Sequence, residues 1–233
     1  MDRRDMLRLM ALGGLASVMA PLLEVCRAQG AKRSSDEKGN CVLIPEETAG
    51  PFTLDLVANP EYLRQDITDG KTGVPLVLEL TLVDVNRGCA PIRNARVDVW
   101  HCDKDGVYSG FAGEETRGET FLRGIQHSDE SGRVTFQTIY PGWYYGRATH
   151  IHFQVFLEDG RTVTSQVAFP EGVTRQIYRS PLYSGRGENT TVPTNAADFV
   201  FRSPAGALPR ELCTLTGSVD GGYTAALNVG IAA

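Results

Sequence analysis

A strand-like segment that carries two histidines constrains this chain more than any other feature. In residues 149–156 every second side chain from Ile151 onward is apolar, and polar side chains lie between them. Alternation with a period of two predicts a β-strand, in which residues i and i+2 point to the same face. His150 and His152 should therefore project side by side, opposite the apolar side chains. This spacing favours a metal site, and two surface histidines on an exposed strand are the alternative.

Other segments repeat this alternation. Leucines occupy every second position from Leu76 to Leu82. Further strands are expected to start at Val97, Arg133 and Tyr223. Short strands separated by Gly and Pro turns are typical of a β-sandwich. We therefore predict an all-β fold, a β-sandwich with long loops and no large helical domain. Residues 175–198, rich in Ser, Pro, Asn and Thr, are expected to form a long loop.

Tyrosines, and not carboxylates, surround the histidine pair in the sequence. Tyr144, Tyr145 and Arg147 precede His150 after a Pro-Gly turn, and the ten residues before His150 contain no Asp or Glu. Hard anionic oxygen suits a ferric ion. A free tyrosine has a pKa near ~10, so its ionisation at neutral pH requires the charge of a metal. Oxygen ligands from this part of the chain would therefore be phenolates.

Three sequence blocks resemble those of a known family. The blocks are residues 45–52, residues 97–108 and residues 141–152, within a similarity that extends from about Cys41 to about Phe169. The chain resembles the intradiol ring-cleavage dioxygenases, the non-haem iron(III) enzymes that include protocatechuate and catechol dioxygenases. The resemblance implies a ferric ion held by Tyr108, Tyr144, His150 and His152. It is greatest to compact, exported, single-domain members, because the long helical dimerisation region of the catechol enzymes has no counterpart here.

The resemblance also implies how the ligands act. The family pattern has a tyrosine two residues after Pro-Gly, which selects Tyr144, with Tyr145 as the alternative. Tyr144 would leave the metal and take up a substrate proton, and O₂ would then be inserted into a catechol-type ring. Cleavage between the two hydroxyl-bearing carbons would give a muconate-type diacid. His101 and His127 are expected outside the ligand set, with His101 in a structural role and His127 in an exposed turn.

Further site residues are implied by position. By resemblance Arg147 stabilises negative charge that develops on the substrate, whereas an ordinary exposed ion pair is the alternative. Gln166 is similar to a glutamine that lies behind the ligands in the family, and a routine strand glutamine is the alternative. Gly50, Pro51 and Phe52 are expected to line the substrate pocket. Phe52 stands where the family usually has a tyrosine, so a polar contact from that ring is lost.

The N-terminus resembles an export signal. Arg3 and Arg4 precede an apolar stretch at residues 9–25, and small residues follow before residue 30. This pattern predicts a signal over residues 1–30 that is twin-arginine-like, with an ordinary Sec signal as the alternative. A membrane anchor is disfavoured because the apolar run is short and contains Glu24. The protein is therefore expected to be exported to the periplasm or secreted.

The remaining chain is long enough for one core. Residues 31–40 are polar and should form a flexible lead, and residues 41–233 should form one intradiol dioxygenase-like β-sandwich domain. Without residues 1–30 the chain has 19 basic and 25 acidic residues, which disfavours nucleic acid as a partner. The remaining cysteines are Cys41, Cys89, Cys102 and Cys213. An exported protein with four cysteines favours one or two disulfides, with three possible full connectivities, and four buried thiols are the alternative.

Two classes of function follow from these features. The favoured one is a ferric intradiol dioxygenase that acts on a catechol-type substrate and O₂. The alternative is a non-catalytic exported β-sandwich that serves as a binding module, or a zinc or copper protein that uses the histidine pair. Tyrosinate-to-iron(III) charge transfer would colour the first class red, whereas zinc-loaded or metal-free protein would be colourless. The residues select neither one particular catechol nor an oligomeric state.

Replacing both Arg3 and Arg4 with lysine should block export if the twin-arginine route is used, because that route requires the arginine pair. A Sec signal would tolerate the change, because the positive charge remains. Fractionation of cells that express the native and the double-mutant precursor measures the difference. Normal export of the double mutant would rule out the twin-arginine route.

Overall fold

The computed structural model describes residues 41–111, 113, 115–204 and 206–233 of the chain. The predicted export signal, residues 1–30, and the predicted flexible lead, residues 31–40, lie outside the described residues. Within the described residues, every helix is too short or too polar to cross a lipid bilayer.

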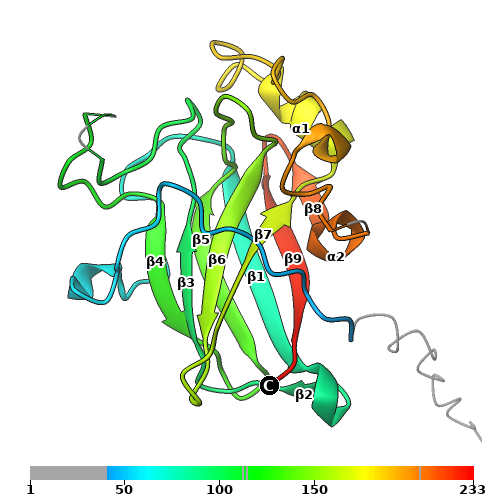
Figure 1. Ribbon diagram of the computed structural model, residues 1–233. Coiled ribbons are helices and arrows are strands. Elements are labelled where there is room, and N and C mark those ends of the chain that lie inside the picture. The colour runs from blue at the N-terminus through cyan, green and yellow to red at the C-terminus, as the bar shows by residue number, and fades with distance from the viewer. Residues whose placement is uncertain (1–40, 112, 114, 205) are drawn as a thin grey trace, which may run out of the picture. The chain divides into compact units, whose positions relative to one another are not determined.

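Two β-sheets pack against each other in the described part of the chain (Figure 1). The first sheet contains β1 (Pro75–Asp84), β2 (Ala90–Pro91), β5 (Arg133–Ile139), β8 (Thr214–Ser218) and β9 (Gly222–Ile231). The second sheet, in the order β4-β3-β6-β7, contains β3 (Arg96–Trp100), β4 (Arg123–His127), β6 (His150–Phe156) and β7 (Thr162–Ala168). The helical segments are α1 (Glu171–Tyr178), α2 (Leu208–Glu211) and the 3-10 turns η2 (Pro60–Tyr62), η3 (Val85–Arg87) and η5 (Asn195–Ala197). The all-β sandwich with long loops is thus confirmed.

The leucine-rich strand β1 lies at the centre of the first sheet. It pairs antiparallel with β5 and parallel with β9. Its alternating leucines, from Leu76 to Leu82, are at most 1 % exposed. Side chains from the second sheet, among them Val99 and Phe153, pack in the same core. Burying one such apolar side chain contributes about 1.5–3 kcal/mol. Because the apolar faces meet inside, the polar face of the second sheet is turned away from this core.

The structure adds elements to those predicted. β1, β3, β5, β6 and β9 coincide with predicted strands, whereas β2, β4, β7 and β8 are additional. His127 is exposed, as predicted, but it is the last residue of β4 and does not lie in a turn. The predicted loop of residues 175–198 begins as a helix, because α1 extends to Tyr178. Ile177 and Tyr178 are buried, and this packing stabilises a helix too short to be stable alone.

The segment between Cys41 and η2, which we call the covering segment, lies over the outer face of the second sheet. In Figure 1 the chain after Cys41, drawn in blue, crosses in front of β7, β6 and β3 before it reaches η2. The backbone N–H of Glu47 donates to the carbonyl oxygen of Thr164 in β7 over 2.8 Å, which holds the segment against the sheet. Polar side chains on this face are consequently buried between the sheet and its covering loops.

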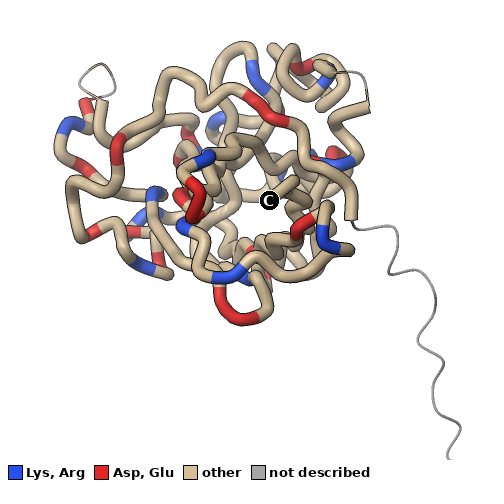
Figure 2. The backbone as a smooth tube through the Cα atoms, turned by 60° about the horizontal axis from the view of Figure 1, so that its bottom comes forward, with Lys and Arg blue, Asp and Glu red and all other residues tan. Residues whose placement is uncertain are grey.

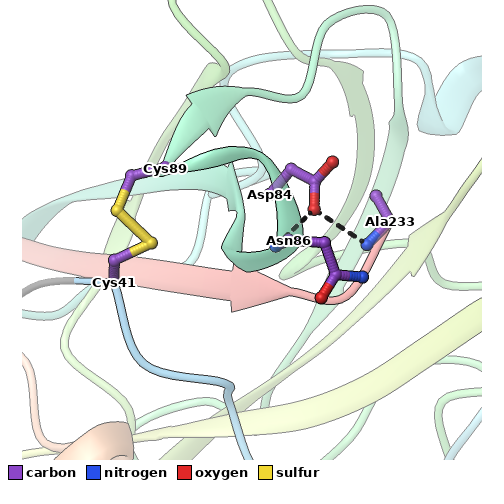
Figure 3. Close-up of a disulfide and its surroundings, with 5 residues drawn as sticks. All are labelled: Cys41, Asp84, Asn86, Cys89 and Ala233. Carbon is purple, nitrogen blue, oxygen red and sulfur yellow. Dashed lines mark hydrogen bonds between the residues drawn. A yellow bond between two sulfur atoms is a disulfide. The ribbon is translucent and has the colours of Figure 1, made fainter.

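A disulfide ties the beginning of this covering segment to the first sheet. Cys41 bonds to Cys89, which precedes β2, with the two Cα atoms 5.6 Å apart (Figure 3). Beside it, Oδ1 of Asp84 accepts hydrogen bonds from the backbone N–H of Asn86 at 2.9 Å and of Ala233 at 3.2 Å. The covering segment, the turn after β1 and the last residue are therefore joined at one end of the sandwich.

Among the described residues, the other two cysteines are free. Cys102 and Cys213 are both buried thiols. The four cysteines of the described residues thus form one bridge and two unlinked thiols. Burial raises the pKa of Cys213 to about 12 and that of Cys102 further. Both side chains stay protonated at neutral pH and act as small apolar core residues.

Charges of both signs are interspersed along the described chain. In Figure 2 blue and red segments alternate around the loops, and the blue segments do not gather into a continuous patch in that view. The net charge of the whole chain is −5. A nucleic-acid-binding surface requires a basic stripe or patch, so the charge pattern agrees with a small-molecule partner better than with a polyanion.

Candidate metal centre

A row of four buried side chains crosses the outer face of the second sheet. Trp100 of β3 is paired with Arg123 of β4 and with His152 of β6, and His152 is paired with Gln166 of β7. Cross-strand neighbours on one face touch each other. The rings of Trp100 and His152 are nearly parallel, at 1°, with centroids 4.9 Å apart. All four side chains are at most 2 % exposed. Strand pairing therefore fixes His152 from both sides.

The two histidines of β6 face each other, with their Nε2 atoms 3.0 Å apart. Nδ1 of His150 lies 2.6 Å from the carbonyl oxygen of Ala148. A carbonyl oxygen only accepts, so Nδ1 carries the proton and Nε2 presents its lone pair. Burial, and then the charge of Arg147, hold the pKa of both imidazoles well below the usual value. Both rings are consequently neutral at pH 7, which is the form that binds metals.

Tyr108 reaches the histidine pair from the loop after β3. Oδ1 of Asp103 accepts a hydrogen bond from the backbone N–H of Val107 at 3.0 Å, and the Thr116 hydroxyl donates to the Tyr108 carbonyl at 2.6 Å. The ring is fully buried, with its centroid 6.5 Å from that of His152. Its Oη has no hydrogen-bond partner among the described residues. Burial holds the pKa of this phenol well above its usual value.

Tyr144 approaches from the loop between β5 and β6. Its ring centroid lies 5.6 Å from that of Tyr108 and 5.5 Å from that of His150. Burial raises the pKa of Tyr144, and the positive charge of Arg147 opposes this rise. The neighbouring Tyr145 is 84 % exposed. The structure therefore brings Tyr144 to the histidines and leaves Tyr145 at the surface.

Arg147 is held beside His150 by a buried ion pair. Its Nε donates to both carboxylate oxygens of Asp198, at 2.9 and 3.2 Å, and the two side chains are 5 % and 0 % exposed. Its Nη2 donates to Oε1 of Gln166 at 2.6 Å, and Nη1 lies 3.5 Å from Nε2 of His150. Gln166 in turn donates to the carbonyl oxygen of Thr48 at 3.1 Å. An exposed ion pair is thus excluded for Arg147, and Gln166 belongs to its hydrogen-bond network.

The covering segment closes the site from above the sheet. Gly50 has φ +72°, and a Cβ added there would lie 3.3 Å from Cε1 of His152. Both its backbone conformation and its close approach therefore favour glycine. The ring of Phe52 is stacked on that of Tyr108, with centroids 4.3 Å apart. Pro51 is exposed. Of the three predicted pocket residues, Gly50 and Phe52 contact the site.

These side chains form a donor set that fits a metal ion. The set consists of Nε2 of His150 and His152 and Oη of Tyr108 and Tyr144. Metal–nitrogen bonds of ~2.1 Å at nearly a right angle separate two nitrogens by ~3 Å, and 3.0 Å is observed. A buried phenol oxygen normally has a hydrogen-bond partner, so the unpartnered Oη of Tyr108 fits a ligand. The oxygen donors beside this pair are the phenols of Tyr108 and Tyr144, which as phenolates suit a ferric ion.

The other two histidines lie apart from this set. His101 is buried, with Nδ1 2.8 Å from the carbonyl oxygen of Cys102 and Nε2 2.7 Å from Oγ1 of Thr138. Burial lowers the pKa of His101 to about 4. Both ring nitrogens of His101 are therefore occupied by structural hydrogen bonds, as the sequence predicted, and His127 is exposed at the end of β4.

Two residues that hold the site were not predicted from the sequence. Asp198 lies 51 residues after its partner Arg147, and Arg123 opens an unpredicted strand. Neither residue belongs to a periodic pattern or a motif. The local signal for Asp198 is the buried pair Val200 and Phe201 that follows it, which indicates that this part of the loop returns to the interior.

A family comparison agrees with this geometry. Residues 50–175, more than half of the chain, match a family model described as dioxygenase. The chain belongs to the dioxygenase family. The matched region contains the four donors together with Arg147 and Gln166, whereas Asp198 lies beyond it.

Curated proteins of this family are similar over part of their length. The hydroxyquinol 1,2-dioxygenase of Corynebacterium glutamicum is 32 % identical over 142 residues, which are 53 % of this chain and 44 % of that protein. The catechol 1,2-dioxygenase of Acinetobacter baylyi is 28 % identical over 146 residues, which are 52 % of this chain and 46 % of that protein. The chain thus spans less than half of the length of these two relatives.

Solved structures are similar over most of the chain. An intradiol ring-cleavage dioxygenase from Tetranychus urticae has a TM-score of 0.73 and 29 % identity, over 82 % of this chain and 95 % of that one. The dioxygenase domain of a carbohydrate-binding fusion protein from Streptomyces sp. SirexAA-E has a TM-score of 0.59 and 23 % identity, over 82 % and 98 %. The second likeness is one of fold alone.

Replacing Asp198 with alanine should lower the free energy of unfolding by about 3–5 kcal/mol, because Arg147 would be left as a buried charge without its partner. Glu130→Ala is the matched control: it breaks an ion pair with Arg93 whose side chains are 60 % and 88 % exposed, and exposed pairs contribute little. Urea unfolding of both variants measures the difference. Equal, small losses would show that Asp198 does not compensate the charge of Arg147.

Proposed function

We propose that this chain is an intradiol ring-cleavage dioxygenase. It binds a catechol-type substrate and O₂ and cleaves the ring between the two hydroxyl-bearing carbons to give a muconate-type diacid. The observation that carries this proposal is the donor set itself: two neutral imidazole nitrogens 3.0 Å apart with the rings of Tyr108 and Tyr144 beside them. Membership of the dioxygenase family supports it, as do relatives named catechol and hydroxyquinol 1,2-dioxygenase.

The proposed cofactor is one ferric ion, with Tyr108, Tyr144, His150 and His152 as its ligands. When bound, the ion would draw electron density from the catechol and activate the ring toward O₂. Two phenolates would offset two of its three positive charges, which favours iron(III) over iron(II). An iron(II) oxygenase site would instead typically contain two histidines and a carboxylate.

The two tyrosines are held unequally, and this suggests separate roles. Tyr108 is fully buried, its backbone carbonyl is bound by Thr116, and its ring is covered by Phe52. Tyr144 is half-buried in a loop. Tyr144 is therefore better able to move, and its Oη is the proposed acceptor of a substrate hydroxyl proton. Tyr108 would remain a permanent anionic ligand.

Arg147 is proposed to stabilise negative charge that develops on the substrate. Asp198 and Gln166 bind its Nε and Nη2, so Nη1 is the end of the guanidinium that lies nearest the histidine pair. A donor that is fixed before the reaction loses no energy to reorientation, which is the source of its electrostatic effect. The network behind Arg147 thus acts by orienting one charge.

An aromatic wall beside the donors suits a flat ring. Phe52 lies edge-on to Phe111 and to Tyr144, with centroids 5.3 and 5.6 Å apart. Aromatic rings prefer such edge-to-face and offset contacts with one another. The wall would exclude water and hold a catechol ring by its faces and edges, while the donor set binds its oxygens.

The iron-loaded protein should consume O₂ with a catechol and release a muconate-type diacid, detected by oxygen electrode and mass spectrometry.

His152→Ala should lose iron and turnover together, because a ligand is removed, while circular dichroism keeps its β signal. His127→Ala, at an exposed position, is the matched control and should retain both. Full iron content and full turnover in His152→Ala would refute the ligand assignment. A native protein that is active while colourless and loaded with zinc would refute the choice of metal.

A further inference from the structure

Arg123 is a fully buried cation that the proposed reaction does not use. It opens β4 and is 0 % exposed. None of the ion pairs formed by the described residues includes it. Arg147, by contrast, has the carboxylate of Asp198 against it. A buried charge without an opposite charge is strongly unfavourable, so Arg123 requires compensation from another group.

The hydrogen bonds of Arg123 go to the residue after Tyr108. Its Nε donates to Oγ of Ser109 and its Nη2 to the carbonyl oxygen of Ser109, both at 2.9 Å. The Ser109 hydroxyl in turn donates to the carbonyl oxygen of Phe121 at 2.6 Å. Nη1 of Arg123 is buried without a hydrogen-bond partner among the described residues. The guanidinium therefore fixes the backbone that carries Tyr108 and retains unused donor capacity.

The same guanidinium lies over the ring of Tyr108. Its Cζ is 5.8 Å from the Tyr108 ring centroid, a distance at which a cation is attracted to the ring. A guanidinium is not deprotonated in proteins, so Arg123 remains a cation at neutral pH. The phenolate of a metal-bound Tyr108 would place negative charge on the ring that Arg123 faces, and the same charge would offset part of that of the metal.

We propose that Arg123 is a positioning residue for Tyr108: it clamps the Tyr108–Ser109 backbone and places a positive charge over the ring that binds the metal as a phenolate. This inference rests on the proposed metal centre. Arg123 and Arg147 then have different partners. Arg147 is paired with Asp198 and serves the substrate, whereas Arg123 lies over the ring of the ligand itself.

The proposal has a spectroscopic consequence that does not depend on turnover. Tyrosinate-to-iron charge transfer moves an electron out of the Tyr108 ring, and a cation over that ring stabilises the electron before the transition. Removing the cation should therefore lower the transition energy and move the band to longer wavelength. A residue that acted only as a backbone clamp would affect the band through geometry, whatever its charge.

The test compares visible spectra of the iron-loaded protein and three variants. Arg123→Gln removes the charge and keeps a donor for Ser109, Arg123→Lys keeps the charge and loses the planar fork, and Ser109→Ala removes the hydroxyl that Nε contacts. We expect a shift to longer wavelength in Arg123→Gln and a nearly native band in Arg123→Lys and Ser109→Ala. If Arg123→Gln does not fold, Arg123→Lys decides the matter: a native band supports the proposal and a shifted band overturns it.

The remaining outcomes separate this inference from the proposed function. The charge-transfer band could shift equally in Arg123→Gln and Arg123→Lys, or as far in Ser109→Ala as in Arg123→Gln. Either result would show that Arg123 acts only as a backbone clamp, and would overturn the role of its charge. An unchanged band in Arg123→Gln would overturn it too, while the metal centre would stand. If the native protein, loaded with ferric iron, shows no charge-transfer band, the metal centre itself fails, and this inference fails with it.

Discussion

The pairing of β6 with β3 on one side and with β7 on the other is the constraint on which the rest of the site depends. It places His152 between Trp100 and Gln166 on one face of the sheet. The opposite face of the same strand packs in the core through Ile151 and Phe153. A shift of register by one residue would exchange the two faces. The apolar core and the donor set are therefore specified by the same alternation, and a register shift would displace both.

Burial of the polar face brings a cost that the structure offsets locally. The segment after Cys41 and the loops cover that face, so the two imidazoles, the phenol of Tyr108 and two guanidinium groups lie out of water. Arg147 is compensated by Asp198, and Gln166 links Arg147 to the covering segment. Arg123 and Tyr108 are a second opposite pair once the phenol ionises.

The sequence predicted what local periodicity and motif spacing can encode. Alternation gave the strand with His150 and His152, and resemblance to a family added Tyr108, Tyr144 and Arg147, which the structure brings together. Asp198 was missed because its role depends on a loop that returns over a distance of 51 residues, and no local pattern encodes such a contact. The strands β4, β7 and β8 were missed because their sequences lack clear alternation: β4 contains a glycine, β7 has Ser165 and Gln166 at consecutive buried positions, and β8 is a largely exposed edge strand rich in Thr.

The role of two tyrosines as ligands of one ferric ion can be measured directly by resonance Raman spectroscopy within the visible charge-transfer band. The iron-loaded protein should show tyrosinate vibrations. Tyr108→Phe and Tyr144→Phe should each remove part of them, and Tyr145→Phe, whose native side chain is 84 % exposed, should leave the spectrum unchanged. A native spectrum without tyrosinate vibrations, or one that depends on Tyr145 and not on Tyr144, would contradict the donor set described for this site.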